Sequence, residues 1–215
     1  MRHTLIILFF SFVLQSVAAQ SGDQVFEFLT LPSSARANAL GGHTVSLVER
    51  DPSLIFHNPA LLGGEMDGMI NLDYMNYIAD VNVGSALFTK AFRERGAWGA
   101  GVHYFHNGKF KGMDENNQST GDFTASDIAV NGFFSYDLSE RWRGGVSMKF
   151  LYSNYDIYTS LGVCFDAGLS YYNSEKEFSF GVVLKNIGAQ LKPYYEDRQK
   201  MPWDIQMGIS KKMNH

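Results

Sequence analysis

The fold is decided by three stretches in the second half of the chain: WRGGVSMKFLYS (142–153), LGVCFDAGLSYY (161–172) and FSFGVVLK (178–185). Apolar residues alternate in them with small or polar residues; Val146 and Met148, for example, alternate with Ser147 and Lys149. Because successive side chains of a strand point to opposite faces, each stretch would present one apolar and one polar face. The pattern therefore predicts β-strands that separate two different media.

Working outward from these stretches, the same alternation predicts eight strands. They lie near residues 67–78, 81–92, 97–107, 125–137, 142–153, 160–172, 177–187 and 203–212. Most of them have 11 to 13 residues, whereas a strand of a soluble protein usually has about 5–6. A tilted strand that crosses a bilayer needs roughly 9–11 residues. The strand length therefore favours an all-β fold, an antiparallel transmembrane β-barrel formed by residues 67–215.

The connections between the expected strands alternate in length. Short turns are expected at 93–96, 138–141 and 173–176, and longer loops at 108–124, 154–159 and 188–202. Only the first hairpin, at Ala79 and Asp80, departs from this trend. Outer-membrane barrels have short periplasmic turns and longer extracellular loops. We therefore expect the short turns to face the periplasm.

Aromatic and charged residues fit the same orientation. Trp98 and Trp142 follow short turns and Trp203 follows a long loop, as expected of aromatic girdles at the two membrane interfaces. The inward-facing positions carry the polar residues Asn131, Arg143, Lys149, Asp166, Lys185, Asp204 and Gln206. The outward-facing positions carry almost no charge, which burial in lipid would require.

The N-terminus predicts export from the cytoplasm. Residues 1–19 read MRHTLIILFFSFVLQSVAA. A positive charge at Arg2 is followed by an apolar run over residues 5–14, which is too short to span a bilayer, and by small residues at Val17 and Ala19. This order of features is typical of a secretory signal peptide that is cleaved after Ala19.

The composition excludes several classes of protein. With 45% hydrophobic and 14% aromatic residues, the chain is not intrinsically disordered. The 18 basic and 22 acidic residues give a net charge of −4 without a basic cluster, so we expect no nucleic-acid partner. The single cysteine, Cys164, allows neither an internal disulfide nor a cysteine-based metal site. Since no catalytic, phosphate-binding or metal-binding motif is present, the sequence predicts no enzyme activity, cofactor or metal.

Residues 20–66 have a different character, rich in turns. Six residues mark these turns: Gly41, Gly42, Asp51, Pro52, Asn58 and Pro59. Residues 33–40 are typical of a short capped helix, which the glycine pair would end. Each proline disfavours helix at the residue before it. An Asn side chain can bond its own backbone and proline presets φ, so we interpret the Asn-Pro pair as a structural turn rather than a ligand site.

Two stretches resemble a known family. LPSSARANALGGHTVSLVERDPSLIFHNPALL (31–62) resembles the N-terminal signature of the FadL-like outer-membrane barrels of Bacteroidetes. With MPWDIQMGISKK (201–212), the chain is similar, more narrowly, to the PorQ-like accessory barrels of the type IX secretion system. The resemblance implies a larger barrel, of fourteen strands, with an N-terminal plug in residues 20–66. An eight-stranded barrel is filled by its own side chains, so we expect these strands to be part of a larger barrel and the chain to be incomplete.

The resemblance also implies a function. The protein would be a non-enzymatic component of the outer membrane, in contact with lipid and with other type IX secretion components, and would help to attach cargo to the cell surface. Aromatic residues in the expected long loops, Phe110, Tyr194 and Tyr195, are the candidate partner contacts.

Two alternatives stay open. One is a FadL-like channel for hydrophobic small molecules, to which Phe88, Phe133 and Leu151 could contribute as inward-facing apolar residues. The other is a soluble periplasmic β-domain, which would expose many Phe, Tyr and Leu side chains to water.

Overall fold

The computed structural model describes residues 24–76, 81–113, 119–195 and 197–212, and within 109–123 it describes no side chains. The expected signal peptide, residues 1–19, lies outside the described residues, as does the first hairpin turn at Ala79 and Asp80.

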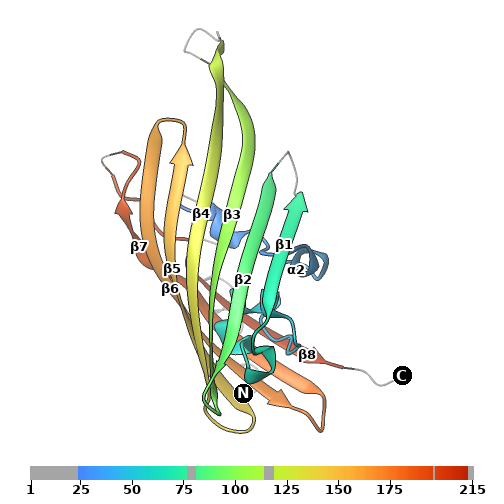
Figure 1. Cartoon of the computed structure of the whole chain (residues 1–215). Helices are drawn as coiled ribbons and strands as arrows, with labels where there is room; N and C mark the ends of the chain where they lie inside the picture. The colour runs from blue at the N-terminus through green and yellow to red at the C-terminus, as the bar shows by residue number, and fades with distance from the viewer. Residues whose placement is uncertain (1–23, 77–80, 114–118, 196, 213–215) are drawn as a thin grey trace, which may run out of the picture.

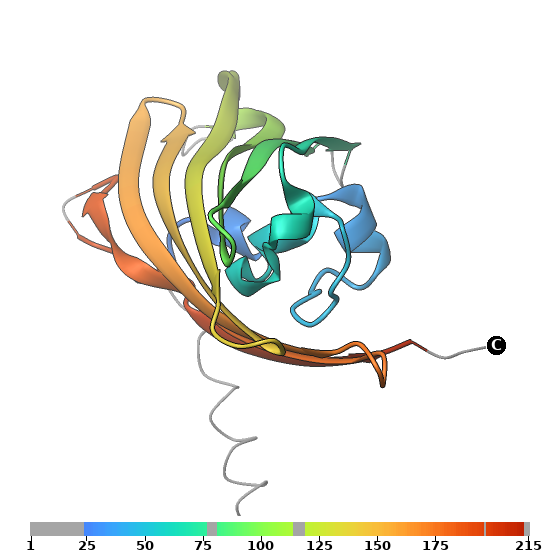
Figure 2. The ribbon, with the colours of Figure 1, turned by 60° about the horizontal axis from the view of Figure 1, so that its bottom comes forward.

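A single antiparallel sheet of eight strands forms the body of the molecule (Figure 1). The strands are β1 (Ile70–Asn76), β2 (Asn82–Phe92), β3 (Gly96–Met113), β4 (Ser119–Asp137), β5 (Trp142–Tyr155), β6 (Tyr158–Asn173), β7 (Phe178–Lys192) and β8 (Asp204–Lys211). Each strand pairs with its neighbours in sequence, which confirms the prediction of an all-β, antiparallel fold. Figure 2 shows that the sheet curves strongly, but within the described residues β1 and β8 do not pair, so the sheet is an open, partial barrel.

Two of the expected long loops are wrong. The expected loop 108–124 is mostly strand, because β3 and β4 continue to pair as far as Met113 and Ser119. Together they form a hairpin that projects beyond its neighbours (Figure 1). The expected loop 154–159 is a turn of two residues, Asp156 and Ile157, between β5 and β6. Backbone pairing needs no apolar face, so strands can run on through polar sequence where alternation gives no signal.

The N-terminal part of the chain lies inside the curve of the sheet (Figure 2). We call residues 24–66 the plug segment. Its short helices are η1 (Glu27–Thr30), α2 (Ala35–Ala39), η2 (Pro52–Phe56), η3 (Pro59–Leu61) and η4 (Gly64–Met66). Among the described residues, none of the helices has the length and apolar character needed to cross a membrane.

The hydrophobic core lies between the plug segment and the inner face of the sheet. The ring of Phe28 lies 5.1 Å from that of Phe105 on β3, and the ring of Phe56 lies 5.3 Å from that of Phe133 on β4. Leu151 is buried in the same cluster as Phe28 and Phe105. The inner face is therefore covered by the plug segment rather than left open to water.

The alternation predicted for the strands is observed in the structure. On β5, Val146 is 52% exposed on the outer face whereas its neighbour Ser147 is 3% exposed on the inner face. The inward assignment of Phe133 and Leu151 is correct, but that of Phe88 is wrong, because Phe88 is exposed on the outer face. In β2, Leu87 lies on the inner face and Phe88 on the outer face. Because both faces carry apolar residues here, hydrophobicity could not predict which residues of β2 face inward.

Candidate functional site

Glycine residues on the inner face form a seat for the plug segment. A Cβ atom at Gly145 would lie closer than 3.0 Å to backbone atoms of Pro59 and Ala60, and one at Gly168 would collide with the Asn58 side chain. A Cβ atom at Gly181 would collide with the backbone of the plug segment in the same way. Since Gly145 pairs with Gly168 across β5 and β6, the plug segment lies directly on the sheet backbone.

The Asn58-Pro59 pair forms a turn above this seat. The Asn58 side chain is fully buried; its Oδ1 accepts a hydrogen bond from the Ala60 N–H at 3.0 Å, and its Nδ2 donates one to the Val45 carbonyl at 2.9 Å. Pro59 is the first residue of η3. Both polar ends of the amide are thus used within the chain, as in an Asx turn.

The other predicted turn residues lie at turns elsewhere in the plug segment. Gly41 and Gly42 have φ values of 95° and 85°, in the left-handed region that favours glycine. Asp51 caps η2, which begins at Pro52, by accepting from the Ser53 N–H at 2.9 Å. Its other carboxylate oxygen accepts from Arg36 at 2.5 Å, so these residues fix the local path of the chain.

His57 lies at the base of the plug segment, where it faces the sheet. It is 3% exposed, and its Nε2 lies 2.8 Å from the Ser33 hydroxyl. Its Nδ1 has no hydrogen-bond partner among the described residues. Burial, with a smaller contribution from the positive charge of Lys185, lowers the pKa of His57 well below its ordinary value of 6.5. The imidazole is therefore neutral at pH 7.

Charged side chains on the inner face hold a bulge between β6 and β7. The register shifts between Phe165 and Ala167, where Asp166 accepts from the Asn186 N–H at 2.8 Å. Lys149 Nζ lies 2.7 Å from Asp166 and donates to the Asn186 side chain at 2.8 Å. The polar residues expected to face inward do so here, where they pair with one another. The arrangement stabilises a strand irregularity.

Two cavities between the plug segment and this cluster are small. Their volumes are about 40 and 30 Å³, enough for one or two water molecules. His57 and Lys185 line both of them.

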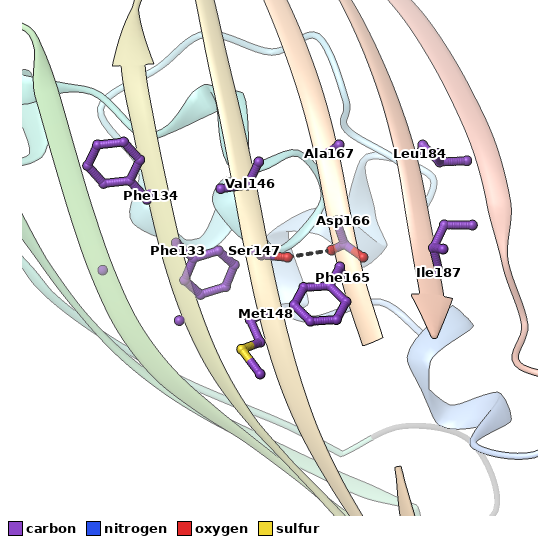
Figure 3. Close-up of a pocket in the computed structure, with 12 residues that line it drawn as sticks. Phe133, Phe134, Val146, Ser147, Met148, Phe165, Asp166, Ala167, Leu184 and Ile187 are labelled. Atoms are coloured by element: carbon purple, nitrogen blue, oxygen red, sulfur yellow. Dashed lines mark hydrogen bonds between the residues drawn. The ribbon is translucent and has the colours of Figure 1, made fainter. Parts of the chain in front are cut away.

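The outer face carries a larger groove, of about 570 Å³. Figure 3 shows apolar side chains along it from β4 to β7, among them Phe134, Val146, Phe165 and Leu184. On the outer face Gly132 has no atom within 4 Å of an ideal Cβ position, so it leaves open space in the groove. The hydrogen bond between Ser147 and Asp166, dashed in Figure 3, lies at the level of the groove. The groove is thus apolar, with the charged cluster on the other side of the same strands.

Two of the candidate partner residues lie in a pocket at the end of the sheet near the β5–β6 turn. Tyr194 contacts Tyr155 edge to face, with ring centroids 5.6 Å apart, and Tyr195 lies 4.7 Å from Tyr158. The pocket has a volume of about 320 Å³ and is also lined by Asp127. We call it the tyrosine pocket. The third candidate, Phe110, lies in β3, but its side chain is outside the described part of the chain.

Sequence reasoning missed three residues of the tyrosine pocket: Tyr155, Tyr158 and Asp127. Two tyrosines that flank a two-residue turn are a recognisable signal once the turn is placed. Asp127 is an acidic residue at an inward-facing strand position, a second signal that was available. No sequence pattern connects these residues with Tyr194 and Tyr195, because the distance along the chain is too great.

The fold and these surfaces define a class of protein: an open, curved antiparallel sheet with a helical plug segment seated on its inner face. Within the described residues, no group of three or more His, Cys, Asp or Glu side chains is placed to bind a metal ion. No protein-family model and no curated protein matches the chain.

Proposed function

We propose that the chain forms the wall and plug of an outer-membrane β-barrel and acts as a non-enzymatic anchor for a protein partner. The observation that carries the proposal is the outer face. Of the strand residues on this face whose side chains are described, only Lys90, Lys192 and Lys211 carry a Lys, Arg, Asp or Glu side chain. Lys90 and Lys211 lie opposite Trp98 and Phe178, at the end of the sheet with the turns 93–95, 138–141 and 174–177, and Lys192 lies at the other end, opposite Leu161.

Large apolar side chains cover the rest of this face. Phe150 is 54% exposed, and Ile209 is 69% exposed. Soluble monomers rarely expose contiguous apolar patches larger than a few hundred Å². Lipid would remove these apolar side chains from water, whereas a soluble periplasmic domain would leave them exposed. The outer face therefore argues against a soluble periplasmic domain.

An aromatic belt at the end of the sheet with the turns 93–95, 138–141 and 174–177 supports the same environment. The ring centroids of Trp142 and Tyr171 lie 5.0 Å apart, and those of Phe88 and Trp98 lie 5.8 Å apart. Amphipathic aromatic rings favour the level of the lipid headgroups. This arrangement supports the position of the turns 93–95, 138–141 and 174–177 at a membrane interface.

The narrower proposal, an accessory barrel of type IX secretion, rests on the resemblance of residues 31–62 and 201–212. These two stretches lie together in the fold. The Ser46 hydroxyl lies 2.8 Å from that of Ser210, and a Cβ atom at Gly208 would press on Val45 and Ser46. Because the two stretches contact each other, they can belong to one structural unit, which supports the use of both in the resemblance.

Deletion of the gene tests the proposal in the host. The anchor function predicts that secreted cargo is released into the medium rather than held at the cell surface. Expression of the wild-type gene should restore attachment. Expression of the double variant Tyr194→Ala/Tyr195→Ala should leave a membrane-inserted protein that restores it less well. Unchanged cargo attachment after deletion would contradict the proposal.

A channel for hydrophobic small molecules is the second candidate, and the apolar inner-face residues Phe133 and Leu151 favour it. Uptake of a labelled fatty acid separates the two functions. A deletion strain that loses uptake but keeps cargo at its surface would establish the channel instead.

A further inference from the structure

Three separate parts of the chain form the walls of the tyrosine pocket, and Asp127 of β4 also lines it. The strands β5 and β6 provide Tyr155 and Tyr158 on either side of their turn. The link between β7 and β8 provides Tyr194 and Tyr195, and residues 24–27 at the start of the plug segment form a third wall. This third wall is tied to the link, because the Val25 N–H donates to the Lys200 carbonyl at 3.0 Å.

The rings form the walls of a box rather than one flat platform. Tyr155 and Tyr194 meet at an interplanar angle of 86°, and Tyr158 and Tyr195 meet at 42°. Burial raises the pKa of Tyr194 above its usual range, so its hydroxyl stays neutral at pH 7. The box therefore presents neutral π faces in several orientations.

A buried carboxylate lies among these rings. Asp127 is 1% exposed; it accepts a hydrogen bond from the Ser153 hydroxyl and one of 2.8 Å from the Asn107 amide. Both donors are neutral. Among the residues whose side chains are described, none forms an ion pair with Asp127. Glu27, a second acidic residue, also lines the pocket. A buried carboxylate without a cationic partner favours a cation beside it.

We propose that the tyrosine pocket binds a small organic cation with an alkylated ammonium group. Aromatic faces attract such a cation through their quadrupole, and its methyl groups pack against the rings without the hydration cost of a bare ammonium. Asp127 supplies the compensating negative charge. A neutral sugar would stack on a single flat ring and would leave this carboxylate without a cation. The inference goes beyond the proposed anchor function and does not depend on it.

Ligand-observed saturation-transfer NMR on the full chain in detergent tests the proposal with choline. The neutral isostere 3,3-dimethylbutan-1-ol has the same shape without the charge, so it isolates the electrostatic contribution. Choline should bind saturably, and about tenfold more tightly than the isostere. Methyl glucoside should not compete with it.

Matched variants locate the site. Asp127→Asn should weaken choline binding by about tenfold, whereas Asp156→Asn should leave it unchanged. Asp156 is exposed at the tip of the β5–β6 turn, carries the same charge and does not line the pocket. Tyr155→Leu should abolish the signal and Tyr155→Phe should retain it, because only the first removes the ring.

Three results would overturn the inference. Equal binding of choline and its isostere would show that charge plays no part. Loss of binding in Asp156→Asn as well as Asp127→Asn would indicate diffuse surface charge rather than the box. Competition by methyl glucoside would assign the pocket to carbohydrate. Because these measurements use purified protein, their failure leaves the cargo-attachment experiment unaffected, and the reverse also holds.

Discussion

A substitution at Val146 can test whether lipid or water surrounds the outer face of the sheet. It lies within β5 and is 52% exposed. In lipid, Val146→Arg should lower the free energy of unfolding by roughly 2–4 kcal/mol, whereas at an exposed site in water the same substitution should change it by no more than about 0.5 kcal/mol. The measurement is urea unfolding of the protein refolded into lipid vesicles.

Leu138→Arg is the matched control for this change. Leu138 is 58% exposed, but it lies in the turn between β4 and β5. An arginine there should cost roughly 0–1 kcal/mol, as at a membrane interface. Equal costs for the two variants would argue against lipid at the middle of the sheet.

His57 gives the plug segment a dependence on pH. Because burial lowers its pKa in the folded state, the unfolded chain binds a proton first as the pH falls. Stability of the docked plug segment should therefore be full above pH 6.5 and decrease below it, by up to about 1.4 kcal/mol per pH unit. Hydrogen exchange of residues 54–62 at pH 7 and pH 5 measures the effect.

The variant His57→Gln is the control for the pH effect. It keeps a polar group near Ser33 but cannot gain a charge in this range. Its protection factors, which correct the exchange rates for the intrinsic effect of pH, should differ less between the two pH values than those of the wild type. An unchanged difference would assign the pH dependence to other groups.

At the scale of elements, the docking of the plug segment depends on missing side chains. Gly145→Ala would drive a methyl group into the backbone of Pro59 and Ala60. Because backbone cannot move aside as a flexible side chain can, the variant should destabilise the docked plug segment by roughly 1–3 kcal/mol. Limited proteolysis at residues 41–64 in the folded protein should report the loss.

Gly132→Ala provides the comparison on the same sheet. An ideal Cβ at Gly132 has no neighbouring atom within 4 Å. This variant should be cleaved at the wild-type rate. If both variants resist protease equally well, close backbone contact does not hold the plug segment.

The elements differ in how far the sequence could predict them. The faces of β5 were predicted because Val146 and Ser147 differ so clearly in polarity. The paired ends of β3 and β4 were not, since residues 108–124 show no alternation and pairing there is a property of the backbone. The β5–β6 turn was missed because Asp156 and Ile157 lack the glycine that usually marks a two-residue turn.

The candidate site was predicted in part for the same physical reasons. The Asn58-Pro59 turn is local, and the chemistry of two adjacent residues was enough to propose it. The tyrosine pocket is not local. Tyr194 and Tyr155 meet only because the β7–β8 link folds back over the β5–β6 turn, which depends on the packing of the whole sheet.

At the scale of the whole molecule, the projecting β3–β4 hairpin gives a test of orientation. If the turns 93–95, 138–141 and 174–177 face the periplasm, this hairpin extends outward from the cell. Protease added to intact cells should cleave within residues 108–124 and spare residues 138–141. Mass spectrometry of the fragments identifies the cleaved bonds. Cleavage confined to residues 138–141 would reverse the orientation.

The contact between Ser46 and Ser210 also constrains how the molecule assembles in time. The sheet itself consists of neighbours in sequence, so each hairpin can form by a short search. The hydrogen bond between these serines joins residues 164 positions apart, and closing that loop costs more conformational entropy than closing a hairpin. The plug segment is synthesised before any strand, yet this part of its binding surface exists only after β8 has been made. This part of the plug segment must therefore remain undocked until β8 has been made.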